Sequence, residues 1–106
     1  MKKTSETSVV NACLDLLRLK RIKAWRNNVG AMKVGKRFVR FGEAGSPDIL
    51  GILPGGRALC VECKFGHNDT TETQDTWLDE ARVAGALVAV VWDVQELDSI
   101  LERNGI

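Results

Sequence analysis

A pair of charges stands inside an apolar run near the middle of this 106-residue chain. In "RALCVECK", residues 57–64, Glu62 and Lys64 follow a stretch made mainly of apolar side chains. Burying a charge costs several kcal/mol or more unless the charge finds a partner or a metal ion. The two side chains therefore either pair with each other or are kept for chemistry.

Asp48, in "GSPDILG", supplies a third charge close to this pair. The segments "DILGIL" and "RALCVECK" flank the turn "PGG", a pattern that predicts an antiparallel hairpin. Side chains alternate between the two faces of a strand, so Glu62 and Lys64 share one face and Cys63 takes the other. Pairing outward from the turn brings Asp48 back toward Glu62 or Lys64. We expect two carboxylates and an ammonium group to converge at the open end of the hairpin.

Such a cluster suits a hard divalent cation. Mg²⁺ is usually held by one or two carboxylates, with water and substrate phosphate in its remaining positions. Asp48 and Glu62 meet that need, and Lys64 could hold the attacking water and neutralise charge as phosphorus is attacked. The alternative is that Glu62 and Lys64 form an exposed cross-strand pair that contributes little to stability.

Cysteine and histidine spacing suggests a different metal. Cys60, Cys63 and His67 spell C-x2-C-x3-H, which invites a zinc interpretation. Strand alternation, however, directs the two sulfur atoms to opposite faces, and the sequence offers no obvious fourth ligand. We therefore expect no zinc site and place His67 in a loop.

The cluster needs elements around it to hold it in place. Apolar residues recur at helical spacing from Thr4 to about Lys23, with Thr4 or Ser5 as the helix cap. Glu6 precedes Val10 by four residues and so shares the buried face, although a first-turn carboxylate also favours the helix dipole. One or two short strands are expected around Trp25 and residues 38–41, followed by a flexible loop.

The second half of the chain has clearer secondary-structure patterns. Residues 71–84 have helical spacing and end before Gly85, "ALVAVVW" is typical of a covered strand, and "VQELDSILER" predicts a closing helix. The expected order is α-β-β-β-β-α-β-α. A chain of this length suits one domain, so residues 1–106 are predicted to form a single α/β domain with a central mixed β-sheet flanked by helices.

Charge is distributed unevenly along the chain. Residues 1–42 carry eleven Lys and Arg against two acids, whereas residues 43–106 carry four against twelve. A basic first half predicts a surface for a polyanion. The alternative is that two oppositely charged, solvated faces attract one another within the fold.

Composition excludes several other classes of protein. With 44% hydrophobic and 27% charged residues the chain is not a disordered one. No apolar run approaches the roughly 18 residues that span a bilayer, and no apolar segment follows the N-terminal lysines as a signal peptide requires. We expect a cytoplasmic protein, in the host cytoplasm if the chain is viral, with reduced cysteines, no membrane partner and no small-molecule organic cofactor.

The residues described so far resemble the PD-(D/E)xK nucleases, read here as Pro47-Asp48 followed by Glu62-Cys63-Lys64. The chain is more closely similar to the virus-type replication-repair nuclease family, the VRR-NUC domain. That similarity extends over nearly the whole chain, through the first helix with its glutamate and through "RNNVG", "GSPDILG", "VECK", "TETQDTWL" and "AGALVAVVWDVQEL". It implies a restriction-endonuclease-like core.

The resemblance also assigns roles to residues. It implies that Asp48 and Glu62 bind Mg²⁺ or Mn²⁺, with the backbone carbonyl of Cys63 as a further ligand and Glu6 beside the ion, and that Lys64 assists the nucleophilic water. Gln74 would orient Lys64 or the water. The candidate phosphate contacts are basic or polar residues of the first half: Arg26, Asn27, Lys33, Lys36, Arg37 and Arg40.

The expected function is therefore metal-dependent hydrolysis of phosphodiester bonds in DNA, selective for branched, flap or junction structures, in phage-type replication or repair. A small domain covers little of a duplex, so we expect a homodimer that places two active sites on two strands. The alternative from another class is a non-catalytic DNA-binding or scaffold module that retains the nuclease fold. Sequence-specific restriction would need base-reading side chains, and the sequence does not identify any.

Overall fold

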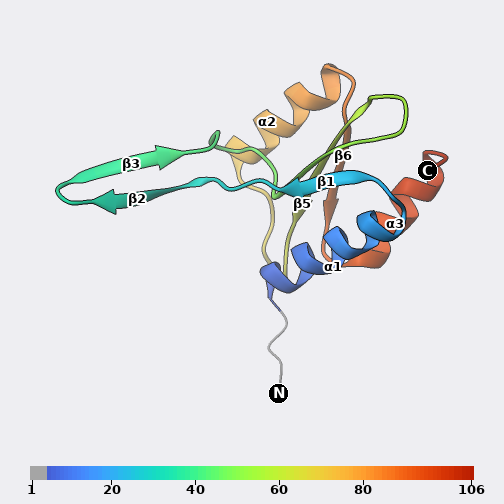
Figure 1. The fold of residues 1–106 in the computed structure, drawn as a ribbon, viewed down its shortest axis with the longest axis horizontal. Coiled ribbons are helices and arrows are strands. Elements are labelled where there is room, and N and C mark those ends of the chain that lie inside the picture. Colours follow the sequence, from blue (N-terminus) through green and yellow to red (C-terminus); the bar gives the residue numbers. More distant parts are fainter. Residues whose placement is uncertain (1–4) are drawn as a thin grey trace.

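The computed structural model describes residues 5–106 and has the order α-β-β-β-β-β-α-β-α (Figure 1). The main sheet contains four strands in the order β1, β4, β5 and β6. Their bounds are Lys23–Arg26, Ile49–Ile52, Ala58–Cys63 and Leu87–Val91. The first three strands are antiparallel neighbours and β6 runs parallel to β5, so the predicted mixed α/β fold is confirmed.

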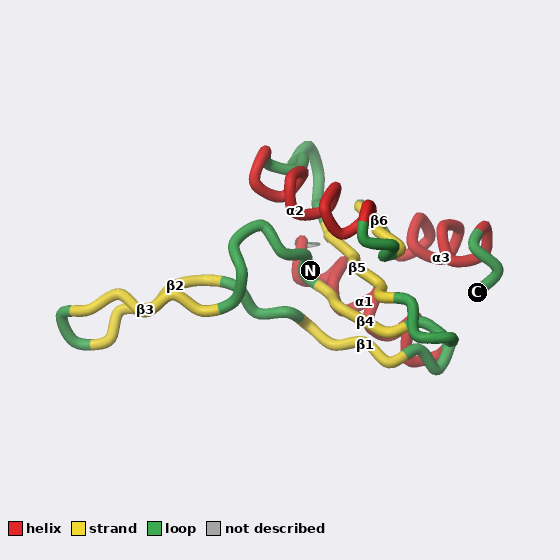
Figure 2. The backbone as a smooth tube through the Cα atoms, turned by 90° about the horizontal axis from the view of Figure 1, so that it is seen from above, coloured by secondary structure: helices red, strands yellow, loops and turns green. Residues whose placement is uncertain are grey.

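Helices cover both faces of this sheet. On one face lie α1 (Glu6–Leu19) and α3 (Val94–Arg103), and on the other lies α2 (Glu72–Val83), which makes the crossover that the parallel pair requires (Figure 2). The larger core lies between the sheet and the α1–α3 layer, where Leu17, Val61 and Leu97 are fully buried. A smaller cluster around Leu78 packs beneath α2.

The predicted helices agree with the structure except at one end. Ser5 caps α1 by accepting a hydrogen bond from the Ser8 amide at 3.2 Å, while the alternative cap, Thr4, lies outside the described residues. The helix ends at Leu19 and not near Lys23, because the chain turns at Arg21, whose φ of 59° cannot continue a helix. Within residues 5–106 no helix combines the length and the apolar character needed to cross a membrane.

The stretch after α1 contains one strand more than the expected order allows. Besides β1, it forms β2 (Gly30–Val34) and β3 (Arg37–Phe41), which pair only with each other as a two-stranded sheet. The expected order omits β2 because its sequence, "GAMKV", has a glycine and little β-branched character. Its extended conformation comes from pairing with β3 through a two-residue turn, where Gly35 has a φ of 62°.

The importance of the α1 core can be tested within one helix. Leu17 is completely buried against the sheet, whereas Leu19, two residues on, is 82% exposed. We expect Leu17→Ala to lower the free energy of unfolding by about 3 kcal/mol, through lost burial and a cavity. Leu19→Ala serves as the control and should change it by less than about 0.5 kcal/mol. Urea denaturation of both variants measures the difference, and equal effects would contradict the described packing of α1.

Candidate active site

The charged cluster lies at the end of the main sheet where β5 and β6 finish and β4 begins. Ile49 pairs with Val61, so Asp48 stands opposite Glu62 across the β4–β5 hairpin. The predicted convergence of these carboxylates is therefore correct. Both long helices that approach this end, α1 and α2, do so with their N-termini, which carry partial positive charge.

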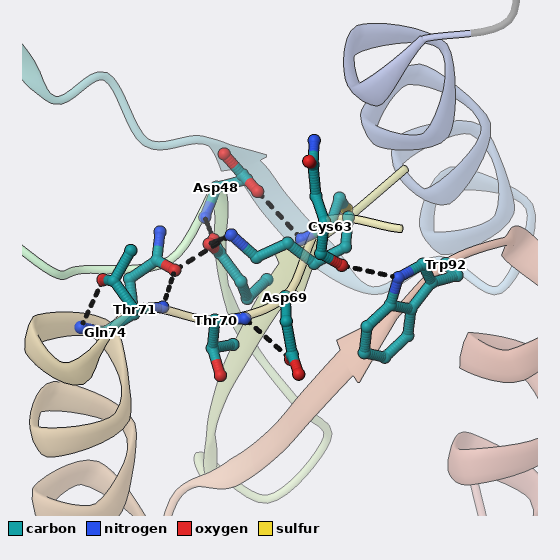
Figure 3. A network of polar contacts seen from close by, with 10 residues as sticks. Asp48, Cys63, Asp69, Thr70, Thr71, Gln74 and Trp92 are labelled. Carbon is teal, nitrogen blue, oxygen red and sulfur yellow. Dashed lines mark hydrogen bonds and ion pairs between the residues drawn. The ribbon is translucent and has the colours of Figure 1, made fainter. Parts of the chain in front are cut away.

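Two hydrogen bonds connect the strands at this end. The amide N–H of Cys63 donates to Oδ2 of Asp48 at 2.8 Å, and the amide N–H of Asp48 donates to Oε1 of Glu62 at 3.2 Å. Figure 3 shows the first of these as a dashed line between Asp48 and Cys63. Each carboxylate is thus held by the backbone of the opposite strand, which fixes both in a defined orientation.

Glu62 and Lys64 form a buried ion pair. Lys64 Nζ lies 3.2 Å from Oε2 of Glu62, and the two side chains are only 7% and 3% exposed, respectively. The pair is buried, and its two residues follow one another along β5 and its end, so the alternative of an exposed cross-strand pair is wrong. Removing one partner of a buried pair leaves an uncompensated charge, so this pair is a strong constraint on its surroundings.

Gln74 provides the second acceptor for Lys64. Lys64 Nζ donates to Oε1 of Gln74 at 2.9 Å, and the Thr71 amide donates to the same oxygen at 3.0 Å. The backbone N–H of Gln74 in turn donates to Oγ1 of Thr71, which completes a capping box at the start of α2 (Figure 3). Sequence reasoning missed this role of Thr71, although the spacing T-x-x-Q in "TETQ" is a recognised signal for it.

A polar cleft of about 310 Å³ opens beside the pair. Its walls include six residues that the sequence singled out: Glu6, Arg26, Asn27, Asp48, Glu62 and Gln74. They come from α1, the end of β1, the loop before β4, β5 and α2, so residues far apart in sequence share one cavity. The cleft can hold on the order of ten water molecules, enough room for a hydrated ion and a phosphate group.

Asn27 supports the loop that carries Asp48. Its side-chain amide donates to Oγ of Ser46 at 2.8 Å and to the carbonyl of Pro47 at 2.9 Å, and its backbone N–H donates to the carbonyl of Asp48 at 2.7 Å. The expected contact between this side chain and phosphate therefore competes with two hydrogen bonds inside the protein. Neither this arrangement nor the part of Ser46 in it could be predicted from the sequence.

The remaining basic candidates lie elsewhere. Lys33, Lys36, Arg37 and Arg40 belong to the β2–β3 hairpin and its turn, and none of them lines the cleft. Arg26, by contrast, is an exposed side chain at the cleft itself. The structure thus divides the six predicted phosphate contacts into two residues at the cleft, Arg26 and Asn27, and four on a separate element.

The cysteines face the two cores. Cys63 is fully buried in the α1-side core beside the Cys13 thiol, whereas Cys60 packs beneath α2. This contact and burial raise the pKa of Cys63. The two sulfurs of the C-x2-C spacing point in opposite directions, as strand alternation predicts, and His67 is exposed in a loop. All three cysteines are free thiols.

The pKa of Glu62 is raised to about 7, mainly because burial disfavours its charged form. The neighbouring Asp48 carboxylate raises this pKa further, and Lys64 opposes both effects. Near neutral pH Glu62 is therefore only partly ionised, and in the protonated fraction the proton takes the place of a second cation. Such a shifted carboxyl group in a cleft is typical of functional sites.

The residues present fit a hard divalent ion in part. Among residues 5–106, no three His, Cys, Asp or Glu side chains form a metal-binding group, so side chains alone would not enclose the ion. Two carboxylates with water and phosphate are nevertheless sufficient for Mg²⁺. Because the Cys63 amide points at Asp48, the Cys63 carbonyl faces the same side of the strand, as the expected ligand set requires.

Comparison with protein-family models gives no match for this chain, and comparison with curated proteins gives none either. The family resemblance consequently rests on the motifs quoted above. We draw the function from the geometry of the cleft.

The buried Glu62 predicts an unusual dependence of stability on pH. Its pKa is about 7 in the folded chain and about 4.5 in the unfolded chain, so between these values the folded state binds more protons. The stabilisation that protonated Glu62 provides is complete below pH 4.5 and is lost as the pH rises through 7. In chelator-treated protein, we expect the free energy of unfolding to fall by up to about 3 kcal/mol over this range.

Glu62→Gln is the matched control, because the amide cannot ionise. Urea denaturation at pH 5, 6 and 7.5 should give a smaller fall for this variant than for the wild type. Parallel pH profiles for the two proteins would show that Glu62 titrates normally.

Proposed function

We propose that this chain is a metal-dependent DNA endonuclease of the VRR-NUC type, which hydrolyses phosphodiester bonds in branched, flap or junction DNA during replication or repair. The observation that carries the proposal is that Asp48, Glu62 and Gln74 line one polar cleft, while the buried Lys64 is bonded to both Glu62 and Gln74. Two carboxylates beside a buried, hydrogen-bonded lysine suit attack of water on a phosphate. A structural ion pair alone would not require Asp48.

Asp48 and Glu62, with the carbonyl of Cys63, would hold Mg²⁺ or Mn²⁺. When bound, the ion would act as a Lewis acid that polarises the phosphate and activates water. The protein's contribution is then one of positioning. Backbone amides hold both carboxylates, so little rearrangement is needed when substrate arrives.

Lys64 would act on the attacking water. Its Nζ is held by Glu62 and Gln74, which leaves a third N–H for the water or for a phosphate oxygen. In the hydrolysis, the oxygen of this water bonds to phosphorus while the water releases a proton to solvent, the bond from phosphorus to the leaving oxygen breaks, and the leaving oxygen takes up a proton from solvent. The ammonium group stabilises the negative charge that builds up on phosphate as this happens.

Arg26 and Glu6 would have supporting roles at the rim. Arg26 is exposed at the cleft, where its guanidinium group can bind a phosphate next to the cleaved one. Glu6 is half-buried in the first turn of α1 and faces the same cavity. From there it would bind a water of the metal ion or complete its ligands.

Loss of the Lys64 ammonium group should abolish cleavage without abolishing DNA binding. We expect Lys64→Ala to cut a branched DNA substrate at least 100-fold more slowly in Mn²⁺, because the water loses its partner, while its affinity for the same DNA changes less than threefold. Lys20→Ala is the control, since Lys20 pairs with Asp98 away from the cleft. Gel assays of cleavage and binding measure both effects. Undiminished cleavage by Lys64→Ala would overturn the mechanism.

The rival proposal is a DNA-binding or scaffold module that keeps the nuclease fold, and metal affinity separates the two. By calorimetric titration with Mn²⁺ we expect one binding event for the wild type and its loss in Asp48→Asn. Asp15→Asn, on the outer surface of α1, should bind like the wild type. DNA binding that weakens with salt, without any uptake of Mn²⁺, would favour the scaffold.

A homodimer remains part of this proposal. On the face of the sheet that carries α2, the helix does not cover Trp25 and Ile52. Their exposed side chains offer apolar surface to a second copy. Two copies would bring two clefts to the two strands of a junction. A monomeric mass by light scattering at micromolar concentration would exclude this arrangement, and cleavage of a panel of labelled DNA structures would identify the preferred branch.

A further inference from the structure

The β2–β3 hairpin, residues 30–41, forms a separate arm of the molecule, here called the β-arm. Figure 1 shows it projecting from the body that contains the main sheet and helices. All ten of its strand residues are exposed, and its strands share no hydrogen bonds with the main sheet. Since an isolated two-stranded hairpin is only marginally stable in water, such an arm is expected to work against a partner.

The pairing register divides the β-arm into two different faces. Lys33 pairs with Phe38 and Ala31 with Arg40, so one face carries Lys33, Arg40 and the 76%-exposed Phe38. The opposite face is mainly apolar, with Met32 paired to Val39. Lys33 and Arg40 are diagonal neighbours, roughly 7–8 Å apart across the strands, so they can contact separate phosphates.

The positive charge of the β-arm favours a polyanion as its partner. Residues 30–41 contain Lys33, Lys36, Arg37 and Arg40 and no Asp or Glu. A second copy of the arm would bring four positive charges against four, which disfavours an arm-to-arm contact. The phosphate backbone of DNA offers the complementary charge.

The β-arm starts and ends at the candidate active site. Asn28 and Val29, just before β2, and Gly45, just after β3, line the same cleft as Asp48. At the base of the arm, Gly42 has a φ of 74° and lies so close to the backbone of Asn28 that a Cβ atom would collide with it. The two connections are therefore packed tightly together, which fixes the direction in which the arm leaves the cleft.

We propose that the β-arm lies along the DNA duplex beside the cleaved bond and binds its phosphates through Lys33, Lys36 and Arg40. Five residues per strand give it a reach of roughly 17 Å, or about five base pairs. A two-stranded ribbon of this kind is narrow enough to enter the major groove of B-DNA. The inference rests on the proposed function, because it takes DNA as the substrate of the same cleft.

The two faces of the arm allow a matched test in the full chain. Lys33→Gln/Arg40→Gln removes two cations from the basic face, whereas Met32→Thr/Val39→Thr changes an equal number of residues on the opposite face. Binding of a fluorescein-labelled 30-base-pair duplex and of a labelled four-way junction is measured by anisotropy in EDTA, from 50 to 200 mM KCl. Cleavage of the junction in Mn²⁺ is measured separately.

We expect Lys33→Gln/Arg40→Gln to bind at least tenfold more weakly at 150 mM KCl. The slope of log affinity against log salt should become shallower by about 1.8, or about 0.9 for each lost phosphate contact. Met32→Thr/Val39→Thr should keep the wild-type slope. A nicked duplex provides a further comparison. Shortening the duplex on one side of the nick to fewer than about five base pairs should weaken DNA binding by the wild type but not by Lys33→Gln/Arg40→Gln.

Other outcomes separate the arm from the nuclease. If the wild type cuts DNA but both variants keep its salt slope, the β-arm inference is overturned and the proposed function stands. If light scattering shows that Met32→Thr/Val39→Thr converts a dimer to a monomer, while Lys33→Gln/Arg40→Gln does not, the arm is a protein interface. The inference is then also overturned. Arm-dependent binding without cleavage supports the inference and contradicts the nuclease, whereas no DNA binding by the wild type at 50 mM KCl overturns both.

Discussion

The buried ion pair of Glu62 and Lys64 is the constraint on which the surrounding structure depends. A charge left without a partner in this position would cost several kcal/mol, so each group must be satisfied from a specific direction. The backbone N–H of Asp48 donates to one oxygen of Glu62, Lys64 pairs with the other, and Gln74 accepts a second hydrogen bond from Lys64. For this to happen, β4 must begin opposite the end of β5, and Thr71 must cap α2 so that the helix begins at Glu72. One pair of charges thus determines where several elements start.

The cluster also contains one negative charge more than stability alone would require. Glu62 and Lys64 neutralise each other, and the addition of Asp48 next to them is unfavourable unless a cation is present. The pKa of Glu62 is raised mainly by burial, and the Asp48 carboxylate raises it further, so a proton can take the place of a second cation. A proton and a divalent ion would therefore compete for the same carboxylate. Such competition would distinguish the proposed cation site from an ion pair that only stabilises the fold.

Much of this arrangement follows from periodicity in the sequence. Alternation along "VECK" places Glu62 and Lys64 on one face, and the short turn between the two strands brings Asp48 opposite them. Helical spacing likewise predicts α2 and α3 closely. What could not be predicted depends on single hydrogen bonds between distant segments, such as those of Asn27 to the loop before Asp48. The strand β2 was missed because its conformation comes from its partner and not from its own residues.

The two parts of the molecule are stabilised in different ways, and this difference suits different tasks. The body buries apolar side chains on both faces of the main sheet, so the carboxylates at its end are held rigidly, as catalysis requires. The β-arm buries little, and only its base is fixed, by the close approach of Gly42 to Asn28 and of Gly45 to Thr73 at the start of α2. A ribbon anchored at one end can adjust its tip to DNA of variable shape without disturbing the cleft. Because Gly45 stands three residues before Asp48, the base of the arm and the carboxylate belong to one loop, so the direction of the arm and the position of the Asp48 carboxylate are set together.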